Sequence, residues 1–435
     1  MSDQPSPTRR TSVELFAGGG GLAMAVHRAG FQPLLVNEFM KAACDTLEAN
    51  GAVARGEEET IPESGDPWPL VRGDVRDLKM GYLEGHVDLL AGGPPCQPFS
   101  LGGIGKGDED KRNMFPEMFR AIREIQPKAV ICENVRGLLR PSFLPYFDYI
   151  LRELARPFEE RDPAARWYEH DAILREREKK DHGEPRERYN VYKYEVNAAD
   201  YGVPQVRNRV IVVAFRADLN INKDLLGRCV RPTHSEAALH ASIRNGSYWE
   251  RHSSVPKHVR TAVDAALPAE LPIDLDDGRK PWRTLRDAIA GIDGQSESPL
   301  PKIRWDRLDR VQYDSMPTDH IGWPDARIYV GHTPNVLDRP AKTVKAGVHG
   351  VPGGESVMLT DSLLKRVDPE SGQRYRHRYM TVRETARVMT FPDTWKLCGP
   401  RGEQMRQLGN AVPVLLGHKF ASAVSEVLKD AELRA

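Results

Sequence analysis

Cysteine is scarce in this sequence, and no two of its cysteines form a CxxC pair. The five that occur are scattered along the chain: Cys44, Cys96, Cys132, Cys229 and Cys398. A disulfide framework needs an even set of cysteines, and a structural zinc site needs closely spaced ligands. The pattern therefore argues against both, predicts no metal site and is typical of a protein of the reducing cytosol.

Long apolar runs and a secretory leader are also lacking. No uninterrupted run of about 18 apolar residues occurs, which predicts that no segment spans a membrane. Residues 1–10 are polar and contain two prolines, whereas a signal peptide has an apolar core. We therefore expect a cytoplasmic protein.

Neither sign of charge is in surplus, because 62 basic residues balance 62 acidic ones. Proteins that bind nucleic acids often carry a basic surplus. DNA responds to the local field in a cleft, however, and the total charge does not report that field. The neutral balance therefore neither supports nor excludes a DNA substrate.

The first third of the chain alternates short apolar runs with helical patterns, which predicts a doubly wound α/β sheet. Strands are expected at residues 12–15, 33–36, 87–91, 129–132 and 210–215, and helices at 21–29 and 115–125. From about residue 217 to 339 this rhythm is lost, and prolines, histidines and basic residues dominate. It returns near the end of the chain with a helical pattern over residues 412–428.

These changes of pattern predict a large domain and a smaller, irregular one. Residues 155–190 form a charged insert, for which a solvated helix or loop is favoured over a contact with DNA or a partner. The expected divisions are a flexible N-terminus at 1–11, a catalytic domain at 12–216, a recognition domain at 217–375, a hinge segment at 376–402, and a segment at 403–435 that returns to the catalytic domain.

A glycine run at residues 18–21 follows the first strand and opens a helix, so its backbone can approach a ligand closely. The run is not GxGxxG and has no Walker lysine, which disfavours dinucleotide and ATP binding. Glu38 ends the second strand, where an acid binds ribose hydroxyls, and Phe39 beside it can pack on adenine. Asp74 follows a third strand and can accept from the adenine amino group. These positions predict an adenosine pocket at the carboxyl edge of the sheet.

A second group of reactive side chains follows the later strands. Cys96 lies in a proline-braced loop directly after the strand at 87–91, which suits an exposed nucleophile. Glu133 ends the next apolar strand, where a carboxyl is either paired or catalytic. Arg207 and Arg209 alternate on one extended segment and therefore point to the same side of it. Two fixed guanidinium groups suit a carbonyl oxygen, a carboxylate or a phosphate.

Eight short motifs, ELFAGGGG, NEF, GDV, PPCQPFS, ENV, QVRNR, RETARVMTFPDTW and QLGNAVP, occur in the order expected of cytosine-5 DNA methyltransferases. The chain resembles this family, of the bacterial restriction–modification type, over residues 12–215 and 376–425. The resemblance implies a Rossmann-like core that uses S-adenosylmethionine, together with a smaller target-recognition domain. One departure is Phe39, where the family commonly has tryptophan; a smaller ring weakens stacking on adenine.

The resemblance also implies a role for particular residues. The catalytic set is Cys96, Glu133, Arg207 and Arg209. The cofactor contacts are Phe16, Gly18, Gly20, Gly21, Leu22, Glu38, Phe39, Asp74, Val75, Pro95, Asn410 and Ala411. The DNA contacts are Ser100, Arg112, Thr343 and Lys345, of which the last two lie in a junction between the recognition region and the core.

In the implied reaction the target cytosine is flipped out of the duplex. The Cys96 thiolate adds to carbon 6, which makes carbon 5 electron-rich, and a protonated Glu133 neutralises charge at ring nitrogen 3. The expected product of the cofactor is S-adenosylhomocysteine. We expect a monomer that modifies double-stranded DNA in the bacterial cytosol, alongside a restriction endonuclease that acts on the same site.

Three alternatives stay open at this stage. A tRNA cytosine-5 methyltransferase is disfavoured because the Cys-Phe-Thr tripeptide of that branch is absent. A catalytically inactive DNA-binding member of the family is disfavoured by the intact Cys96, Glu133 and Arg207. A nicotinamide or flavin oxidoreductase is disfavoured by the lack of a GxGxxG motif.

Overall fold

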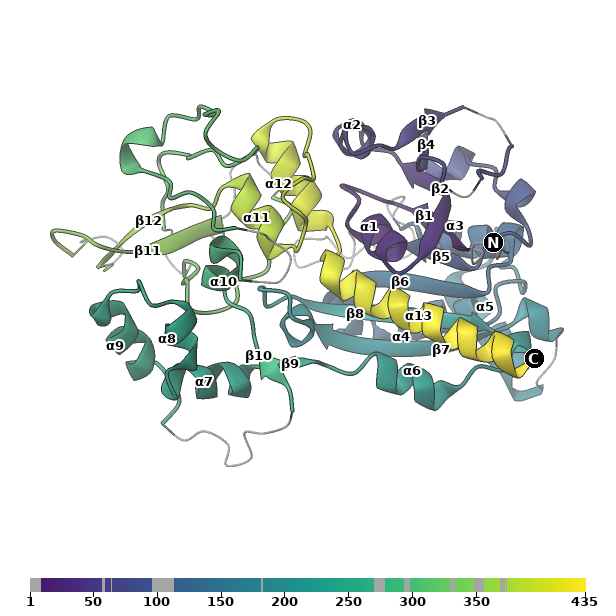
Figure 1. Cartoon of the computed structure of the whole chain (residues 1–435). Coiled ribbons are helices and arrows are strands. Elements are labelled where there is room, and N and C mark those ends of the chain that lie inside the picture. The colour runs from purple at the N-terminus through teal and green to yellow at the C-terminus, as the bar shows by residue number, and fades with distance from the viewer. Residues whose placement is uncertain are drawn as a thin grey trace, which may run out of the picture. The chain divides into compact units, whose positions relative to one another are not determined.

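The fold is described from a computed structural model of the whole chain (Figure 1). The structure describes residues 9–56, 59–63, 65–95, 113–180, 183–269, 278–292, 298–328, 333–347, 356–367, 372 and 374–435. The chain divides into two compact units. Unit 1 contains residues 1–196, 208–230 and 417–435, and unit 2 contains residues 197–207 and 231–416.

This division differs in place from the boundaries expected from the sequence. Residues 197–207, which include Arg207, belong to unit 2 although they precede the last strand of the large sheet. The chain returns to unit 1 at Gly417, inside a long helix, and not at residue 403. Apolar periodicity shows where an element runs but not where contacts between elements change, which explains the difference.

Unit 1 is built on a sheet of eight strands. In spatial order they are β3 (Val53–Arg55), β4 (Pro69–Arg72), β2 (Phe31–Glu38), β1 (Arg10–Leu15), β5 (Leu89–Gly92), β6 (Ala129–Val135), β8 (Asn208–Arg216) and β7 (Tyr189–Asn197). The strands from β3 to β6 pair in parallel, and β8 pairs antiparallel with β6. The expected α/β architecture is therefore confirmed, and each expected strand is present with slightly different ends.

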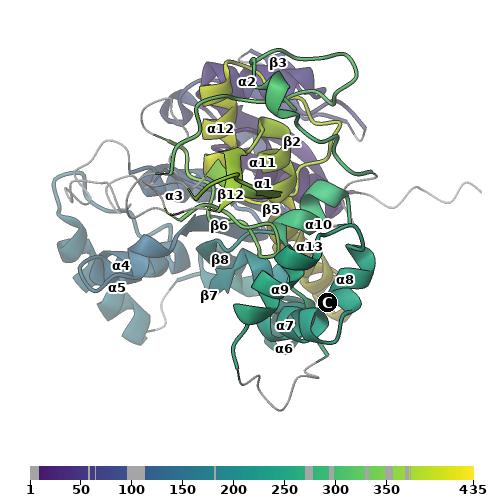
Figure 2. The same cartoon turned by 90° about the vertical axis from the view of Figure 1, so that its left-hand side faces the viewer.

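Helices cover both faces of this sheet (Figure 1). They are α1 (Gly21–Arg28), α2 (Lys41–Ala49), α3 (Phe115–Ile125), α4 (Leu144–Ala155), α5 (Trp167–Lys180), α6 (Lys223–Cys229) and the later part of α13 (Val414–Arg434). Figure 2 shows α4 and α5 side by side, and their aromatic residues meet in one cluster with Tyr146, Tyr149 and Trp167. Residues 167–180 of the charged insert form the helix α5, most of which is exposed.

Near the end of the chain, one stretch of the described residues resembles a membrane span in length and composition. It lies within Arg401–Arg434, but 67% of its most apolar window is buried inside the protein. Core helices of globular proteins have the same composition. The stretch is therefore explained by burial of α13 in the core.

Among the described residues, unit 2 consists of short helices, two strand pairs and two isolated bridges. Its helices are α7 (Glu236–Arg244), α8 (Ser247–Arg251), α9 (Lys257–Ala265), α10 (Leu285–Ala290), α11 (Val382–Val388) and α12 (Arg401–Asn410). Strand β9 (His234–Ser235) pairs with β10 (Lys280–Pro281), and β11 (Val357–Leu363) pairs with β12 (Tyr375–Tyr379). The irregular second unit expected from the sequence is present, although it is richer in helix than the loss of rhythm indicated.

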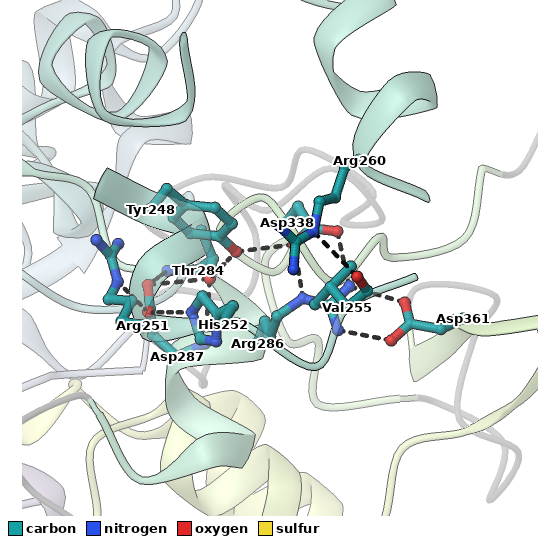
Figure 3. Close-up of polar contacts among 10 residues, drawn as sticks. All are labelled: Tyr248, Arg251, His252, Val255, Arg260, Thr284, Arg286, Asp287, Asp338 and Asp361. Atoms are coloured by element: carbon teal, nitrogen blue, oxygen red, sulfur yellow. Dashed lines mark hydrogen bonds and ion pairs between the residues drawn. The ribbon is translucent and has the colours of Figure 1, made fainter. Parts of the chain in front are cut away.

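A buried polar network holds unit 2 together at α10 (Figure 3). The Arg286 guanidinium donates to both oxygens of Asp338, at 2.6 and 2.8 Å, and to both oxygens of Asp361, each at 2.7 Å. The Tyr248 hydroxyl donates to Asp338 at 2.9 Å and shares a hydrogen bond with Thr284. One arginine therefore ties α10 to the turn at residue 338 and to β11.

Asp287, the next residue along α10, anchors a second part of the network. Its carboxylate accepts from Arg251 at 3.0 Å and contacts the His252 ring at 2.8 Å. Burial opposes the charged form, but the bonds from His252 and Arg251 prevail and lower the pKa of Asp287 to about 2. Asp287 also closes a capping box with Thr284, which fixes the start of α10.

We predict that Asp338→Ala destabilises the protein by about 3 kcal/mol, because it leaves buried donors of Arg286 and Tyr248 unpaired. Asp361→Ala is the matched control, since the Asp361 side chain is 30% exposed and that of Asp338 only 6%. The control should lose about 1 kcal/mol or less. Urea unfolding measures both values, and equal losses would contradict the assignment of Asp338 as the buried centre.

Unit 1 contains a different kind of buried charge in β1. Glu14 is 1% exposed, and the only hydrogen bond to its carboxyl group among the described residues comes from the Ser12 hydroxyl at 2.7 Å. Burial raises the pKa of Glu14 to about 8, although the Ser12 bond opposes the shift. At neutral pH the folded protein therefore holds this carboxyl protonated.

We predict a pH-dependent gain in stability for Glu14→Gln. Between about pH 4.5 and 8 the unfolded chain releases a proton that the folded protein keeps, so folding stability falls with rising pH by about 1.4 kcal/mol per unit. Glutamine does not titrate. The free energy of unfolding of the variant, relative to that of the parent protein, should therefore rise between about pH 4.5 and 8 and stay constant above pH 8. Urea unfolding at several pH values measures the difference in unfolding free energy between variant and parent, and Glu184→Gln, at an exposed position, is the control. If the free energies of the parent and of Glu14→Gln changed equally with pH, the prediction would be wrong.

Candidate active site

The strand order of unit 1 places a crevice at one edge of its sheet. β1 lies between β2 and β5, and the order of the strands along the chain reverses at this point. In open α/β sheets ligands bind outside the carboxyl ends of the strands at such a reversal. The segments that follow β1 and β5, residues 16–20 and 93–95, both begin at this edge.

The segment after β1 is a tight turn built on unusual backbone angles. Phe16, Gly18 and Gly20 all have positive φ, at 58°, 55° and 89°. A side chain on Gly18 would be strained, and the space where its Cβ would stand is open to at least 4 Å. Gly20, Gly21 and Leu22 are buried where α1 begins. The turn therefore presents main chain next to open space, as close approach of a ligand requires.

Glu38 holds this turn from the end of β2. Its carboxylate accepts from the Gly18 amide and from the Met40 amide, each at 2.6 Å. The residue is 6% exposed, and burial raises its pKa against the lowering effect of these bonds. The neighbouring Phe39 is 68% exposed, an unusual position for a large apolar ring. Glu38, the acid expected to bind ribose, and Phe39, the ring expected to pack on adenine, thus lie together at this edge of the sheet.

Asp74 follows β4 at the same edge. It caps a short turn by accepting from the Arg76 amide at 3.0 Å, and the Arg76 guanidinium pairs with its carboxylate. This pair lowers the pKa of Asp74 against a smaller effect of burial. Val75 beside it is buried at 4% exposure. Arg76 was not anticipated, because a partner two residues away in a turn has no periodic signal.

The segment after β5 is fixed against the end of β6. The Asn134 side chain donates to the Pro94 carbonyl at 3.0 Å, and a Cβ on Gly93 would stand 3.7 Å from a Glu133 carboxylate oxygen. Pro95 is exposed. Since Cys96 follows Pro95 directly, the loop that carries it starts beside Glu133 and Asn134. Cys96 itself, Ser100 and Arg112 lie outside the described residues.

Glu133 forms an ion pair with Arg209 across the β6–β8 ladder. Glu133 is opposite Ile211 and Val135 is opposite Arg209, so the two charged residues are diagonal neighbours on one face. Arg209 Nε lies 2.7 Å from Glu133 Oε1, and the two side chains are 11% and 10% exposed. This places the carboxyl and a guanidinium together at the strand end next to the Cys96 loop.

Arg207, a member of the expected catalytic set, is buried among main-chain carbonyls. In unit 2 it is 1% exposed, and its guanidinium donates to the carbonyls of Val344, Gly409 and Ala411 at 2.9, 2.8 and 3.0 Å. These three acceptors are main-chain atoms far along the chain from Arg207. Through these bonds Arg207 connects its own segment, residues 197–207, to the segment around residue 344 and to that at residues 409–411.

The segment around Thr343 packs on the same stretch of chain. The Thr343 hydroxyl donates to the Val206 carbonyl at 2.8 Å, and a Cβ on Gly409 would stand 2.4 Å from the Ala346 amide. Lys345 and Asn410 are exposed, and Ala411 is buried. Gly409 therefore permits a close approach of two backbones, which a sequence without coordinates does not reveal.

Two further observations limit the chemistry. No group of three or more His, Cys, Asp or Glu side chains suited to a metal ion occurs in the part of the chain that the structure describes. Burial raises the pKa of Cys132 to about 12, and burial with the nearby Glu38 raises that of Cys44 to about 11. These two thiols are held in the form that does not attack.

The comparisons with known proteins agree with this geometry. The family model of the C-5 cytosine-specific DNA methylase matches residues 10–156 and 183–426. Residues 157–182, which the match omits, contain α5 and most of the charged insert. The insert is thus an addition to the part of the chain shared with the family.

The chain is also similar to curated enzymes over nearly its whole length. It is 30% identical to the Type II methyltransferase M.PspPI of Psychrobacter sp. (strain TA137), over 98% of this chain and 81% of that protein. It is 28% identical to the Type II methyltransferase M.NgoMIV of Neisseria gonorrhoeae, over 96% of this chain and 98% of that protein.

Solved structures share the fold at lower identity. The S. pombe Dnmt2 methyltransferase has a TM-score of 0.52 and 16% identity, over 97% of this chain and 99% of that one. The Entamoeba histolytica methyltransferase EhMeth has a TM-score of 0.52 and 13% identity, over 99% and 100%. The family match over most of the sequence, the near full-length relatives and the shared fold lead to one conclusion: this chain belongs to the C-5 cytosine-specific DNA methylase family.

Proposed function

We propose that Cys96 is the nucleophile with which this DNA cytosine-5 methyltransferase attacks carbon 6 of its target cytosine. The observation that carries the proposal is the Glu133–Arg209 pair beside the segment that leads into Cys96. Addition of the thiolate forms a sulfur–carbon bond and turns the ring into an enamine, whose carbon 5 then attacks the methyl group. Loss of the carbon 5 proton and departure of the thiolate complete the reaction.

Glu133 supplies the proton that ring nitrogen 3 needs as negative charge develops there. Arg209 holds the Glu133 carboxyl in position through the 2.7 Å contact. Its guanidinium keeps further donors on Nη1 and Nη2 for a ring carbonyl oxygen, apart from one bond to the Asn208 carbonyl. The two residues then act as one unit that protonates and orients the base.

We assign Arg207 to positioning, in place of a direct contact with the base. Its bonds to Val344, Gly409 and Ala411 hold the segment that contains Asn410, which the family resemblance places at the cofactor. A buried arginine that satisfies main-chain carbonyls fixes the course of the backbone. Arg207 thereby sets the position of Asn410 and Thr343 within unit 2.

S-adenosylmethionine is the proposed methyl donor, and the turn after β1 fits such a ligand. The Glu38 carboxylate accepts from the amides of Gly18 and Met40 and keeps lone pairs that can accept from ribose hydroxyls. Phe39 offers a ring face for adenine, and Asp74 an acceptor for its amino group. Gly18, Gly20 and Gly21, with Phe16, Leu22, Val75, Pro95 and Ala411, complete the proposed contacts. The bound cofactor supplies a methyl group on a sulfonium, which makes that methyl electrophilic.

The biological role that we propose is modification of duplex DNA at a specific site in the bacterial cytosol. Relatives over nearly the whole chain are named Type II methyltransferases, which supports a restriction–modification system with a cognate endonuclease. One chain holds both units, so the proposed function needs no second subunit, and we propose that the enzyme acts as a monomer. Ser100, Arg112, Thr343 and Lys345 are the proposed DNA contacts of the family motifs, and unit 2 is the proposed recognition domain.

We predict that duplex DNA with 5-fluorocytosine at the target traps the enzyme covalently. Fluorine replaces the proton that must leave, so the Cys96 thioether persists after methyl transfer. The adduct should require S-adenosylmethionine, survive denaturing electrophoresis and map by mass spectrometry to the Cys96 peptide. Cys96→Ser should form no adduct, because a hydroxyl ionises far less than a thiol. Glu133→Gln should form it slowly, because an amide does not supply the proton.

Cys229→Ser is the control and should trap like the parent enzyme, since Cys229 is partly exposed outside the proposed site. An adduct that maps to another cysteine, or full trapping by Cys96→Ser, would overturn the mechanism. Trapping with fluorinated tRNA in place of DNA would favour the tRNA alternative. Sequence-specific binding of DNA without methyl transfer would favour an inactive family member.

We further predict that Asp74→Ala weakens binding of S-adenosylmethionine. Loss of a charge-assisted contact to the adenine amino group is worth about 1.5–3 kcal/mol, or about tenfold to a hundredfold in the dissociation constant. Isothermal titration calorimetry on the folded variant measures this constant. Asp77→Ala, an exposed acid three residues further on, should leave the affinity unchanged; equal affinity for both variants would refute the role of Asp74.

A further inference from the structure

Unit 2 contains a group of arginines stacked on aromatic rings. Its members, called here the arginine–aromatic cluster, are Trp305, Arg310, Trp323, Arg376, Tyr379 and Arg401. The Arg310 guanidinium lies 4.6 Å and that of Arg401 4.9 Å from the Trp323 ring centre. Arg401 is also 5.6 Å from the Tyr379 ring, and Arg376 is 5.2 Å from that of Trp305.

The cluster is partly open to solvent. The Arg310 side chain is 54% exposed, and Trp305 is 41% exposed although tryptophan is ordinarily well buried. Stacking on a ring fixes the plane of a guanidinium without using its N–H donors. The cluster therefore presents oriented donors at a surface.

Positive charge in the cluster is incompletely neutralised by the described residues. Arg310 has only Asp325 near it, at 4.0 Å, and the Asp325 side chain is 81% exposed. Neither Arg376 nor Arg401 forms an ion pair with any residue that the structure describes. Nearby acids are engaged elsewhere: Asp306 by Arg304, Asp309 by Tyr313, Asp319 by Arg383 and Glu403 by Arg406.

Arg401 shows most clearly that an anion would be favourable here. Its Nε is buried and has no hydrogen-bond partner among the described residues, and Nη2 reaches the Met380 carbonyl only at 3.3 Å. Burial lowers the pKa of Arg401 to about 10, and the only opposing effect comes from Tyr379. Arg401 is thus a desolvated cation that stacks on the same indole ring as a second cation, Arg310. Buried charges ordinarily have a counter-charge, and Arg401 has none among the described residues.

We propose that the arginine–aromatic cluster binds the phosphodiester backbone of the DNA substrate through Arg310 and Arg401. A phosphate supplies the missing negative charge, and its oxygens match the fork of donors on a guanidinium. The proposal rests on the proposed function of unit 2 as the part that binds duplex DNA. It assigns to this cluster a contact that is independent of base sequence and separate from Thr343 and Lys345.

The salt dependence of DNA binding tests the proposal. Each phosphate contact that is lost lowers the slope of log affinity against log salt concentration by about 0.9. Arg310→Ala and Arg401→Gln should each reduce the slope by about that amount and weaken binding about tenfold at moderate salt. The affinity should fall by the same factor for a labelled duplex that contains the target site of the enzyme and for a duplex that lacks this site. Arg304→Ala is the matched control, because Arg304 is exposed in the same segment but paired with Asp306.

The full chain is used throughout, and thermal unfolding first shows that each variant is folded. Arg310 is exposed, so its variant tests the idea even where Arg401→Gln fails to fold. Unchanged slopes in folded variants would overturn the proposal, and so would relaxed site preference at an unchanged slope, which indicates contact with a base edge. Binding of duplex DNA by the parent enzyme is measured before any variant. If the parent enzyme bound no duplex DNA, the proposed function itself would be wrong.

Discussion

One reversed strand determines the chemistry available in unit 1. β8 runs antiparallel beside β6, whereas all the strands from β3 to β6 are parallel. A parallel strand in this place would end, not begin, at the crevice, so residues at its start would lie at the opposite edge of the sheet. Because β8 starts at the crevice, Arg209 stands within 2.7 Å of Glu133. The carboxyl thereby has a fixed cationic neighbour next to the loop of the nucleophile.

The two units bury charge by the same rule but with different partners. In unit 1 Glu38 is satisfied by main-chain amides, which at the same time fix the turn beside it. In unit 2 Arg207 is satisfied by main-chain carbonyls, and Arg286 by two carboxylates. Each buried charge therefore holds a backbone segment that the local secondary structure does not hold. Glu14 departs from this rule, and its raised pKa shows that it is accommodated by staying neutral.

How much of this was predictable depends on the range of the interaction. β6 and β8 follow from apolar runs, and the positions of Glu38 and Asp74 follow from strand ends, because these signals lie within a few residues. The main-chain carbonyls that accept from Arg207 were not predictable in this way, because Val344 and Gly409 are 137 and 202 residues away from it. The same holds for Arg310, Trp323 and Arg401. A local signal did exist there, since arginine and aromatic residues alternate closely in the sequence from 304 to 313, but it names no partner for them.

Binding that does not depend on sequence has a specific use in an enzyme that flips a base. Extrusion of the cytosine costs a few kcal/mol of stacking and pairing, and the cost is similar whichever site is bound. Contacts to base edges discriminate between sites and are available only at the correct one. Contacts to phosphates contribute at every site, so they keep the enzyme on DNA while it searches. A rigid cationic surface such as that of Arg310 and Arg401 suits this second task, because its donors are oriented before DNA arrives. We propose that unit 2 also holds the residues that read base edges, and these then supply the difference in affinity between sites.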